Sequence, residues 1–201
     1  PIIELNSSNI FSSDGSIMNL SPIGNSLEFD GKNDFVSIDD PVINNSSFTI
    51  ILNMKTNVQG KQLLWIGHSL LNSSSYSLYI DLDNDNFYTV LRNGSQNMNL
   101  TTNYQLADNE WHNLAITFQD GLLKHYIDGV LVDGTEAPFA SISTYNNTFT
   151  MLGVGMGNNQ GWGSRYYNGL IDDYAVYDTA LNSNQINSIM NESMDILSGN
   201  L

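Results

Sequence analysis

The sequence predicts an all-β fold, an antiparallel sandwich or barrel, with one short helix near the C-terminus. Short runs of β-branched and aromatic residues recur along the chain, and Gly, Asn, Asp and Ser separate them. The runs follow one another at about 8–12 residues without helices between them, which is typical of sandwiches and barrels.

The expected strands, in chain order, are 27–30, 35–38, 48–55, 62–67, 76–82, 86–92, 111–118, 122–128, 149–155 and 170–178. Five turn dipeptides lie beside them: Asp30-Gly31, Asn93-Gly94, Asp120-Gly121, Asp128-Gly129 and Asp133-Gly134. Asp-Gly and Asn-Gly suit tight turns because both residues tolerate positive φ. In 111–118, Leu114, Ile116 and Phe118 alternate with polar residues, as in an antiparallel strand with one buried face.

A helix is expected after Ser183, because Ile186, Ile189 and Met190 fall on one face. No internal repeat or Pro-rich linker divides the chain, so residues 1–201 are interpreted as one domain. The first twenty residues are interpreted as an edge strand or the remnant of a linker. Since the chain starts at Pro1 with neither a Met nor a signal peptide, we expect a segment of a longer protein.

The charge balance excludes several classes of partner. The formal net charge is −15, with only six Lys and Arg residues, so the chain cannot present the positive face that a nucleic-acid binder needs. Binding to an anionic membrane is disfavoured for the same reason. No apolar run approaches the roughly 20 residues of a membrane span. The chain has no cysteine, which excludes disulfides and thiolate metal sites. Divalent cations, neutral ligands and basic partners remain.

Four stretches, 27–38, 48–55, 108–132 and 168–186, resemble the laminin-G-like, concanavalin A-like jelly-roll domains. The third and fourth are the most specific. A Trp-His pair opens a strand, a DG turn follows, the next strand ends in YIDG, and a later G-x-I-D-D strand runs into a helix. The resemblance implies an antiparallel two-sheet β-sandwich of the concanavalin A-like jelly-roll type, with one short C-terminal helix.

Two residues depart from the family pattern. Asn53 interrupts an apolar strand, and His125 stands where these domains usually have an apolar residue. We interpret His125 as a packed, hydrogen-bonded residue in preference to a ligand of a metal.

The sequence predicts a domain without catalytic activity. Retaining glycosidases of this fold need two carboxylates about 5–5.5 Å apart, supplied by a Glu-x-Asp-x-Glu strand, and no such motif occurs here. The adjacent pairs Asp39–Asp40 and Asp172–Asp173 are expected to point to opposite faces of their strands. His68, His112 and His125 lack the spacing of a zinc site.

The stretch DLDNDN is a first candidate for a calcium site. Asp81, Asp83 and Asp85 are spaced like the start of a helix-loop-helix calcium loop, which also needs Gly at its sixth position and Glu at its twelfth. This chain has Asn86 and Arg92 there, and strands flank the segment. A polar hairpin turn is therefore the better interpretation.

The resemblance implies a structural calcium ion elsewhere, between Asp30 in FDGKND and Asp172 in GLIDD. Asn33 and Asp34 are weaker additional candidates, and Asp173 is the alternative to Asp172. Asp172 is expected to face inward together with Tyr174 and Val176, where an unpaired carboxylate is costly. Calcium would supply the opposite charge, since it binds mixed carboxylate and carbonyl oxygens. The alternative is that Asp172 accepts backbone hydrogen bonds without a metal.

Sugar recognition needs a flat aromatic ring and planar polar side chains around it. The loop NNQGWGSRYYNG carries Trp162, Arg165, Tyr166 and Tyr167 among Gly, Asn and Gln. The alternative is a loop that folds Trp162 onto the sandwich. Further candidates for the same sheet are Trp65, His68, Tyr79, Tyr88 and Arg92, although cross-strand packing is the commoner role for each.

We therefore expect a non-catalytic, lectin-like carbohydrate-binding module of a secreted or cell-surface protein, with a structural calcium ion. The expected partner is an oligosaccharide or polysaccharide, neutral in preference to anionic. An extracellular adhesion domain that contacts proteins, or a spacer domain, is the alternative, and a glycan-active enzyme is a weaker one.

Overall fold

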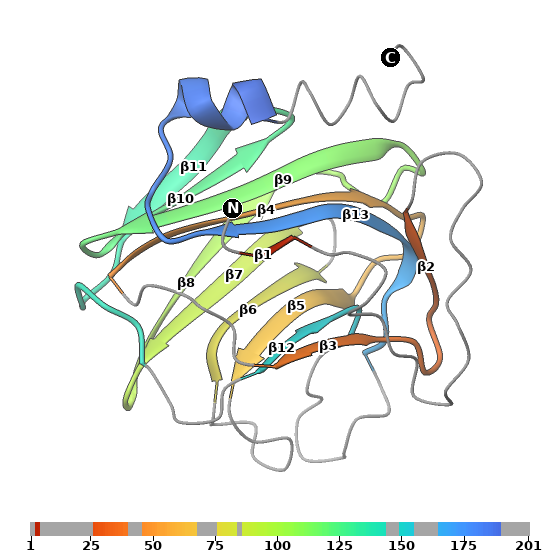
Figure 1. Ribbon diagram of the computed structural model, residues 1–201, viewed down its shortest axis with the longest axis horizontal. Helices are drawn as coiled ribbons and strands as arrows, with labels where there is room; N and C mark the ends of the chain where they lie inside the picture. Colours follow the sequence, from red (N-terminus) through yellow and green to blue (C-terminus); the bar gives the residue numbers. More distant parts are fainter. Residues whose placement is uncertain are drawn as a thin grey trace.

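Two antiparallel sheets stacked face to face make up the fold, which confirms the predicted sandwich (Figure 1). The computed structural model describes residues 3–4, 26–39, 46–67, 76–83, 86–143, 149–154 and 165–189. The helix over residues 183–189 lies above the outer face of one sheet.

The helix-bearing sheet has seven strands. Its order is β1 (Ile3–Glu4), β13 (Asn168–Tyr177), β4 (Ser47–Lys55), β9 (Trp111–Gln119), β10 (Leu122–Ile127) and β11 (Val130–Glu136), and β2 (Leu27–Asp30) also pairs with β13.

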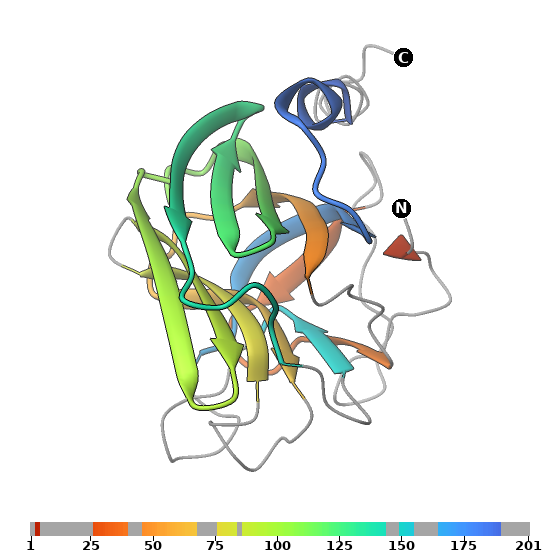
Figure 2. The ribbon, with the colours of Figure 1, turned by 90° about the vertical axis from the view of Figure 1, so that its left-hand side faces the viewer.

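The second sheet has six strands and lies below the first in Figure 1. Its order is β3 (Val36–Asp39), β12 (Phe149–Leu152), β5 (Lys61–Gly67), β6 (Tyr76–Asp83), β7 (Asn86–Asn93) and β8 (Gln96–Asn103). The two sheets approach each other where β8 meets β11, on the side that Figure 2 turns toward the viewer.

The hydrophobic core fills the space between the sheets. In β9, Leu114, Ile116 and Phe118 face it, as the alternation predicts, and Phe48 of β4 stacks on Phe118 with ring centroids 5.5 Å apart. The other face of β9 is covered as well, since Ala115 packs with residues of the C-terminal helix. Because both faces of β9 are covered, its sequence places buried residues at nearly every position.

Two of the predicted turns have the expected strained backbone. At Asp120-Gly121 and Asp128-Gly129 both residues have positive φ, between 49° and 95°, which is the conformation of a type I′ hairpin turn. The prediction for Asp133-Gly134 is wrong, because this dipeptide lies inside β11. Asp133 and Gly134 pair with His125 and Lys124 of β10, and the register of the ladder shifts beside them, at Val132.

Strand β13 contains a bulge that reverses the expected side-chain alternation. The ladder with β4 shifts between Asp172 and Ala175, and Asp173 has a φ of 48°. One extra residue in a strand moves every later side chain to the other face. Ile171 and Tyr174 therefore both face the core. The prediction that Asp172 shares the inward face of Tyr174 is wrong, since Asp172 pairs with Asn53 on the outer face.

His125 lies in the core and links the two sheets. Its ring is fully buried and stacks on Phe87 with ring centroids 4.1 Å apart. Its Nδ1 is 2.8 Å from the Thr102 hydroxyl, and its Nε2 is 2.8 Å from the Thr89 hydroxyl. Thr102 donates its proton to Asp133, so it accepts from Nδ1–H, and Thr89 donates to Nε2. A neutral His125 thus has both ring nitrogens satisfied, which confirms its interpretation as a packed residue.

The C-terminal helix begins with a capping box. The Asn182 side chain accepts hydrogen bonds from the backbone N–H groups of Asn184 and Gln185, and the Gln185 side chain accepts one from the Asn182 N–H. Ile186 and Ile189 then pack onto the seven-stranded sheet as predicted, while Met190 lies outside the described residues. Within the described ranges, no helix is long and apolar enough to cross a membrane.

Candidate functional site

The outer face of the six-stranded sheet carries most of the predicted ligand-binding side chains that the structure describes. In β6, Leu78, Ile80 and Leu82 point into the core, so Tyr79 and Asp81 point to the outer face. The neighbouring strand β7 follows the same rule.

In β7, Phe87 and Leu91 belong to the core, whereas Tyr88 and Arg92 face outward. The register brings the two strands' outer residues together, with Asp81 directly opposite Tyr88.

Aromatic side chains gather on this outer face. Met151 and Val154 are buried there, and Phe35, Tyr79 and Tyr166 pack against them while keeping part of their own surface exposed. The Tyr88 ring lies beside Tyr79, with centroids 6.0 Å apart and planes inclined by 50°. We call this surface, together with Asp81 and Arg165, the tyrosine face.

An ion pair lies within the tyrosine face. Arg165 Nη2 is 2.9 Å from Asp81 Oδ2, and the Asp81 side chain is 2% exposed against 33% for Arg165. A carboxylate removed from water in this way needs a partner of opposite charge, which Arg165 supplies from the segment before β13. The predicted hairpin within DLDNDN is confirmed, since Asp83 of β6 pairs with Asn86 of β7. The interpretation of Asp81 as part of its solvated turn is wrong, because Asp81 lies within β6 and is buried.

Trp65 of β5 belongs to the same part of the sheet by its backbone position. It pairs with Met151 of β12 on one side and with Tyr79 of β6 on the other. Its side chain lies outside the described part of the structure. Arg92, also on this face, donates a hydrogen bond from Nε to the Gly94 carbonyl at 3.0 Å.

The remaining predicted ligand residues do not join the tyrosine face. Tyr167 is fully buried in the core, where its hydroxyl donates to the carbonyl of Lys55 at 3.0 Å. A ligand cannot reach it, so its prediction as a ligand contact is wrong. Trp162 and His68 lie outside the described residues.

Asp81, Phe35 and Met151 are members of the face that sequence reasoning missed. Strict alternation in YSLYIDLD would have placed Asp81 on the same side as Tyr79, because the two lie two residues apart. Phe35 and Met151 carry no comparable signal, since their contact depends on the pairing of β3 with β12 across more than 100 residues.

The residues predicted to share a calcium ion are separated. Asp30 pairs with Asn168, and Asp172 lies four residues further along β13, or about 13 Å at 3.3 Å per residue. Oxygens bound to one calcium ion lie within about 5 Å of each other. The Asp30 carboxylate also turns to its own loop, where it accepts the Lys32 N–H at 2.8 Å, and Asn33 is exposed in the same turn. Asp30 and Asp172 therefore do not meet at one ion.

Asp172 and Asp173 form a smaller acidic pair at the β13 bulge. Asp172 Oδ1 accepts the N–H of Asp173, and Asp173 Oδ2 accepts a hydrogen bond from the Asn53 amide at 2.8 Å. Burial, and then the charge of Asp173, raise the pKa of Asp172 above its usual value. In the described part of the chain, no three His, Cys, Asp or Glu side chains are grouped to hold a metal ion. The full calcium site expected from the sequence therefore does not fit.

Residues 30–187 match the family model described as the concanavalin A-like lectin/glucanases superfamily, laminin G type 3. The chain belongs to this family. No curated protein matches the chain in sequence.

Solved structures resemble this laminin G type 3 domain at low identity. Domain 4 of AbnA, an extracellular GH43 arabinanase from Geobacillus stearothermophilus solved with arabinotriose, has a TM-score of 0.67 and 20% identity, over 87% of this chain and 80% of that one. The CBM40 domain of the Ruminococcus gnavus IT-sialidase, bound to α2,3-sialyllactose, has a TM-score of 0.67 and 18% identity, over 82% and 96%. A SAP-like pentraxin from Limulus polyphemus has a TM-score of 0.62 and 15% identity, over 82% and 81%. These likenesses concern the fold.

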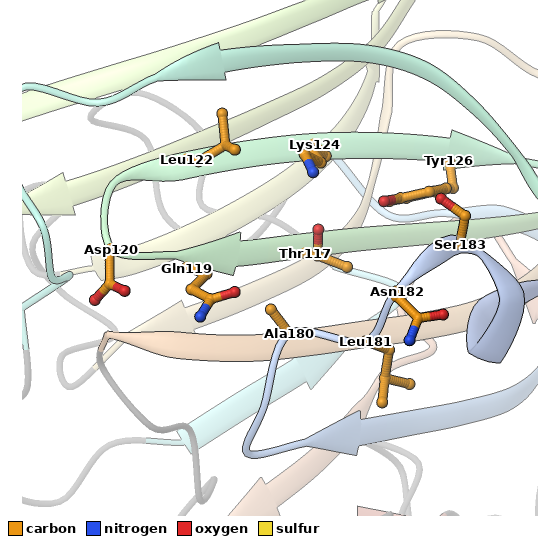
Figure 3. A pocket seen from close by; sticks show the side chains of 10 residues that line it. All are labelled: Thr117, Gln119, Asp120, Leu122, Lys124, Tyr126, Ala180, Leu181, Asn182 and Ser183. Atoms are coloured by element: carbon orange, nitrogen blue, oxygen red, sulfur yellow. The ribbon is translucent and has the colours of Figure 1, made fainter.

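The opposite side of this laminin G type 3 domain carries a groove of about 380 Å³ (Figure 3). Outward-facing residues of β9 and β10, the turn between these strands and residues 180–183 at the start of the helix line it, with Lys124 and Thr117 near its centre. The aromatic residue in its lining, Tyr126, is 2% exposed and packs beneath the helix, so it offers no ring face to a sugar. The tyrosine face is therefore the better candidate for carbohydrate binding.

Proposed function

We propose that this domain is a non-catalytic carbohydrate-binding module of an extracellular protein, and that it holds its glycan on the tyrosine face. The observation that carries the proposal is the cluster of partly exposed tyrosines, Tyr79, Tyr88 and Tyr166, beside the Asp81–Arg165 ion pair.

The chemistry of this surface suits a sugar. The apolar faces of pyranose rings stack on aromatic rings, and the tyrosine hydroxyls remain able to donate and accept hydrogen bonds. Arg165 adds a rigid set of N–H donors at the edge of the aromatic cluster. An apolar surface with a few fixed polar groups is the usual composition of a ligand site.

Known relatives in fold support a sugar as the partner. The arabinanase domain was solved with arabinotriose, and the sialidase domain was solved with sialyllactose. The first belongs to an enzyme described as extracellular, which supports the same location for this domain.

A binding role is favoured over hydrolysis by the state of Asp81. Its carboxylate is held in an ion pair with Arg165 and is 2% exposed, so a glycosidic oxygen cannot reach it. Hydrolysis of a glycosidic bond needs a pair of carboxyl groups that act together on that bond.

A glycan array followed by calorimetry with the best glycan tests the proposal. Tyr79→Ala and Tyr88→Ala are each expected to weaken binding about tenfold, which corresponds to about 1.4 kcal/mol for the loss of one stacking ring. Tyr104→Ala is the matched control, because Tyr104 is exposed and lies against His112 at the rim of the sandwich. Equal affinity in all three variants, or a folded protein that binds no glycan at millimolar concentration, would contradict the proposal.

Structural calcium at Asp172 and Asp173, without Asp30, is a separate proposal. Its support is the half-buried Asp172 carboxylate, whose pKa is raised by burial and by Asp173. A divalent cation would favour the charged form of both groups. Backbone oxygens near the bulge would have to complete the coordination, because Asn53 donates its amide N–H to Asp173 and its amide oxygen accepts a hydrogen bond from Asn113.

A protein-contact role has one supporting observation. Val130 and Leu131 are neighbours at the start of β11, an edge strand, and are 61% and 48% exposed. Exposed apolar side chains at a strand edge favour contact with another chain. A blank glycan array together with concentration-dependent association, lost in Leu131→Ser, would favour this role over sugar binding.

A further inference from the structure

We propose that Asp81 sets the charge preference of the tyrosine face: by neutralising Arg165, it directs the face toward neutral glycans and against glycans that carry carboxylates. The inference rests on the proposed sugar-binding function and names the class of sugar that the same site accepts.

The two members of the ion pair lie at different depths. One third of the Arg165 side chain is exposed, whereas the Asp81 side chain is 2% exposed and lies behind it. A ligand on the face can therefore contact the guanidinium but not the carboxylate. Asp81 acts on the ligand through Arg165 and through its own electric field, without touching the ligand.

The position of the pair places this field among the stacking rings. Asp81 is directly opposite Tyr88 in the β6–β7 ladder, and Tyr79 precedes it on the same face of β6. A sugar that stacks on Tyr79 or Tyr88 thus lies next to Arg165 and within range of the buried negative charge.

The field of Asp81 offsets much of the attraction that Arg165 would exert on an anion. A ligand carboxylate about 4 Å from the guanidinium would lie about 7 Å from Asp81, so by the inverse dependence on distance the repulsion cancels a little over half of the attraction. The formal net charge of −15 opposes the approach of an anion further.

A neutral glycan does not experience this repulsion. Arg165 carries five N–H donors, and the ion pair with Asp81 engages one of its terminal nitrogens, Nη2. The remaining donors can bind sugar hydroxyls. The ion pair also holds the side chain in place before the ligand arrives, which lowers the entropy lost on binding.

The test compares a neutral oligosaccharide with the uronic acid oligosaccharide of the same linkage and length, by calorimetry at low salt. The wild-type protein is expected to bind the neutral glycan at least tenfold more tightly. Asp81→Asn keeps the size of the side chain and removes its charge, and it is expected to raise the ratio of uronate to neutral affinity at least tenfold. The gain should weaken with added salt.

Arg165→Gln, added to Asp81→Asn, is expected to abolish the gain in uronate affinity. This double variant shows that the effect acts through Arg165. Arg165→Gln alone is expected to leave the wild-type preference for the neutral glycan in place. Because Asp81 then lacks its counter-charge, a higher ratio of uronate to neutral affinity in this single variant than in the wild type would mean that Asp81 does not repel anions.

Three results would overturn the inference. They are a wild-type preference for the uronate, an affinity ratio that does not change in a folded Asp81→Asn protein, and a higher ratio of uronate to neutral affinity in Arg165→Gln alone than in the wild type. The first and third need only proteins that keep Asp81, so they apply even if Asp81→Asn fails to fold. If neither glycan binds and the array is blank, the proposed function itself has failed. Tyrosine-dependent binding with an unchanged ratio contradicts only the role of Asp81.

Discussion

Acid should destabilise the folded protein through His125. Burial lowers the pKa of His125 to about 3, and the nearby charge of Asp133 offsets only part of this effect. In the unfolded chain a histidine has a pKa of about 6.5. Below that pH, His125 is protonated in the unfolded state and stays neutral in the folded state. The free energy of unfolding therefore decreases as the pH falls from about 6.5 toward 3.

The size of the effect follows from these two pKa values. One pKa unit corresponds to about 1.36 kcal/mol, so His125 costs about 2 kcal/mol at pH 5 and less than about 0.1 kcal/mol at pH 7.5. The value at pH 5 depends almost entirely on the unfolded pKa, because the folded pKa lies well below 5. For a domain of this size, about 2 kcal/mol corresponds to a decrease in Tm of about 4–8 °C.

Urea denaturation at pH 7.5 and pH 5.0 measures this change, with His125→Gln as the perturbation. The variant is expected to lose about 2 kcal/mol less than the wild type between the two pH values.

His112→Gln is the matched control, because His112 titrates in the opposite sense. Its hydrogen bond to Asp128, and less strongly to Asp108, holds the pKa of His112 above its usual value. Its stabilising charge is present below about pH 6.5 and is lost as the pH rises through the folded pKa, so this variant should lose more than the wild type on acidification. The same pH dependence in wild type and His125→Gln would refute the account of a buried, neutral His125.

Two further predictions concern Asp172 at the β13 bulge and the close packing of Gly153 against Phe29. In buffer with a chelator, Asp172→Asn is expected to raise stability at pH 7, because burial and the charge of Asp173 raise the pKa of Asp172, and such a carboxylate opposes folding above its pKa. If calcium binds at this bulge, added calcium should raise the Tm of the wild type and not that of Asp172→Asn. An unchanged Tm in both proteins contradicts calcium binding. A lower stability of Asp172→Asn in the chelator buffer contradicts the destabilising role of the Asp172 charge. Gly153→Ala is expected to cost about 1–3 kcal/mol more than Gly60→Ala, because both have φ near 75° but only a Cβ at Gly153 would lie 2.2 Å from Phe29. Equal losses of unfolding free energy in the two alanine variants, measured by urea denaturation, would mean that the Phe29 ring can move aside without cost.

Most strands could be predicted from local patterns, because their alternation and their flanking turns are local properties of the chain. The strand β8 was missed because its apolar residues, Met98 and Leu100, are neither β-branched nor aromatic and lie among Asn residues. The strand β11 was missed because Asp133-Gly134 has the composition of a turn. The bulge at Asp173 could not be foreseen, since an Asp with positive φ is set by pairing with β4 and not by its neighbours in sequence.

The candidate site was predictable in its aromatic residues and not in its charges. Tyr79, Tyr88 and Tyr166 could be proposed because aromatic residues in a sandwich of this family are candidates for sugar contact. The pairing of Asp81 with Arg165 joins segments 84 residues apart in sequence, and no local pattern indicates it. Tyr167 differs from Tyr166 only by one position, yet it lies in the core and not on the tyrosine face.

A crystal structure of the domain with its best array glycan tests the central claim most directly. We expect a sugar ring within van der Waals contact of Tyr79 or Tyr88, with at least one hydroxyl within hydrogen-bond distance of Arg165 and none in contact with Asp81. A glycan bound in the groove beside Lys124 and Tyr126, with the tyrosine face empty, would contradict it.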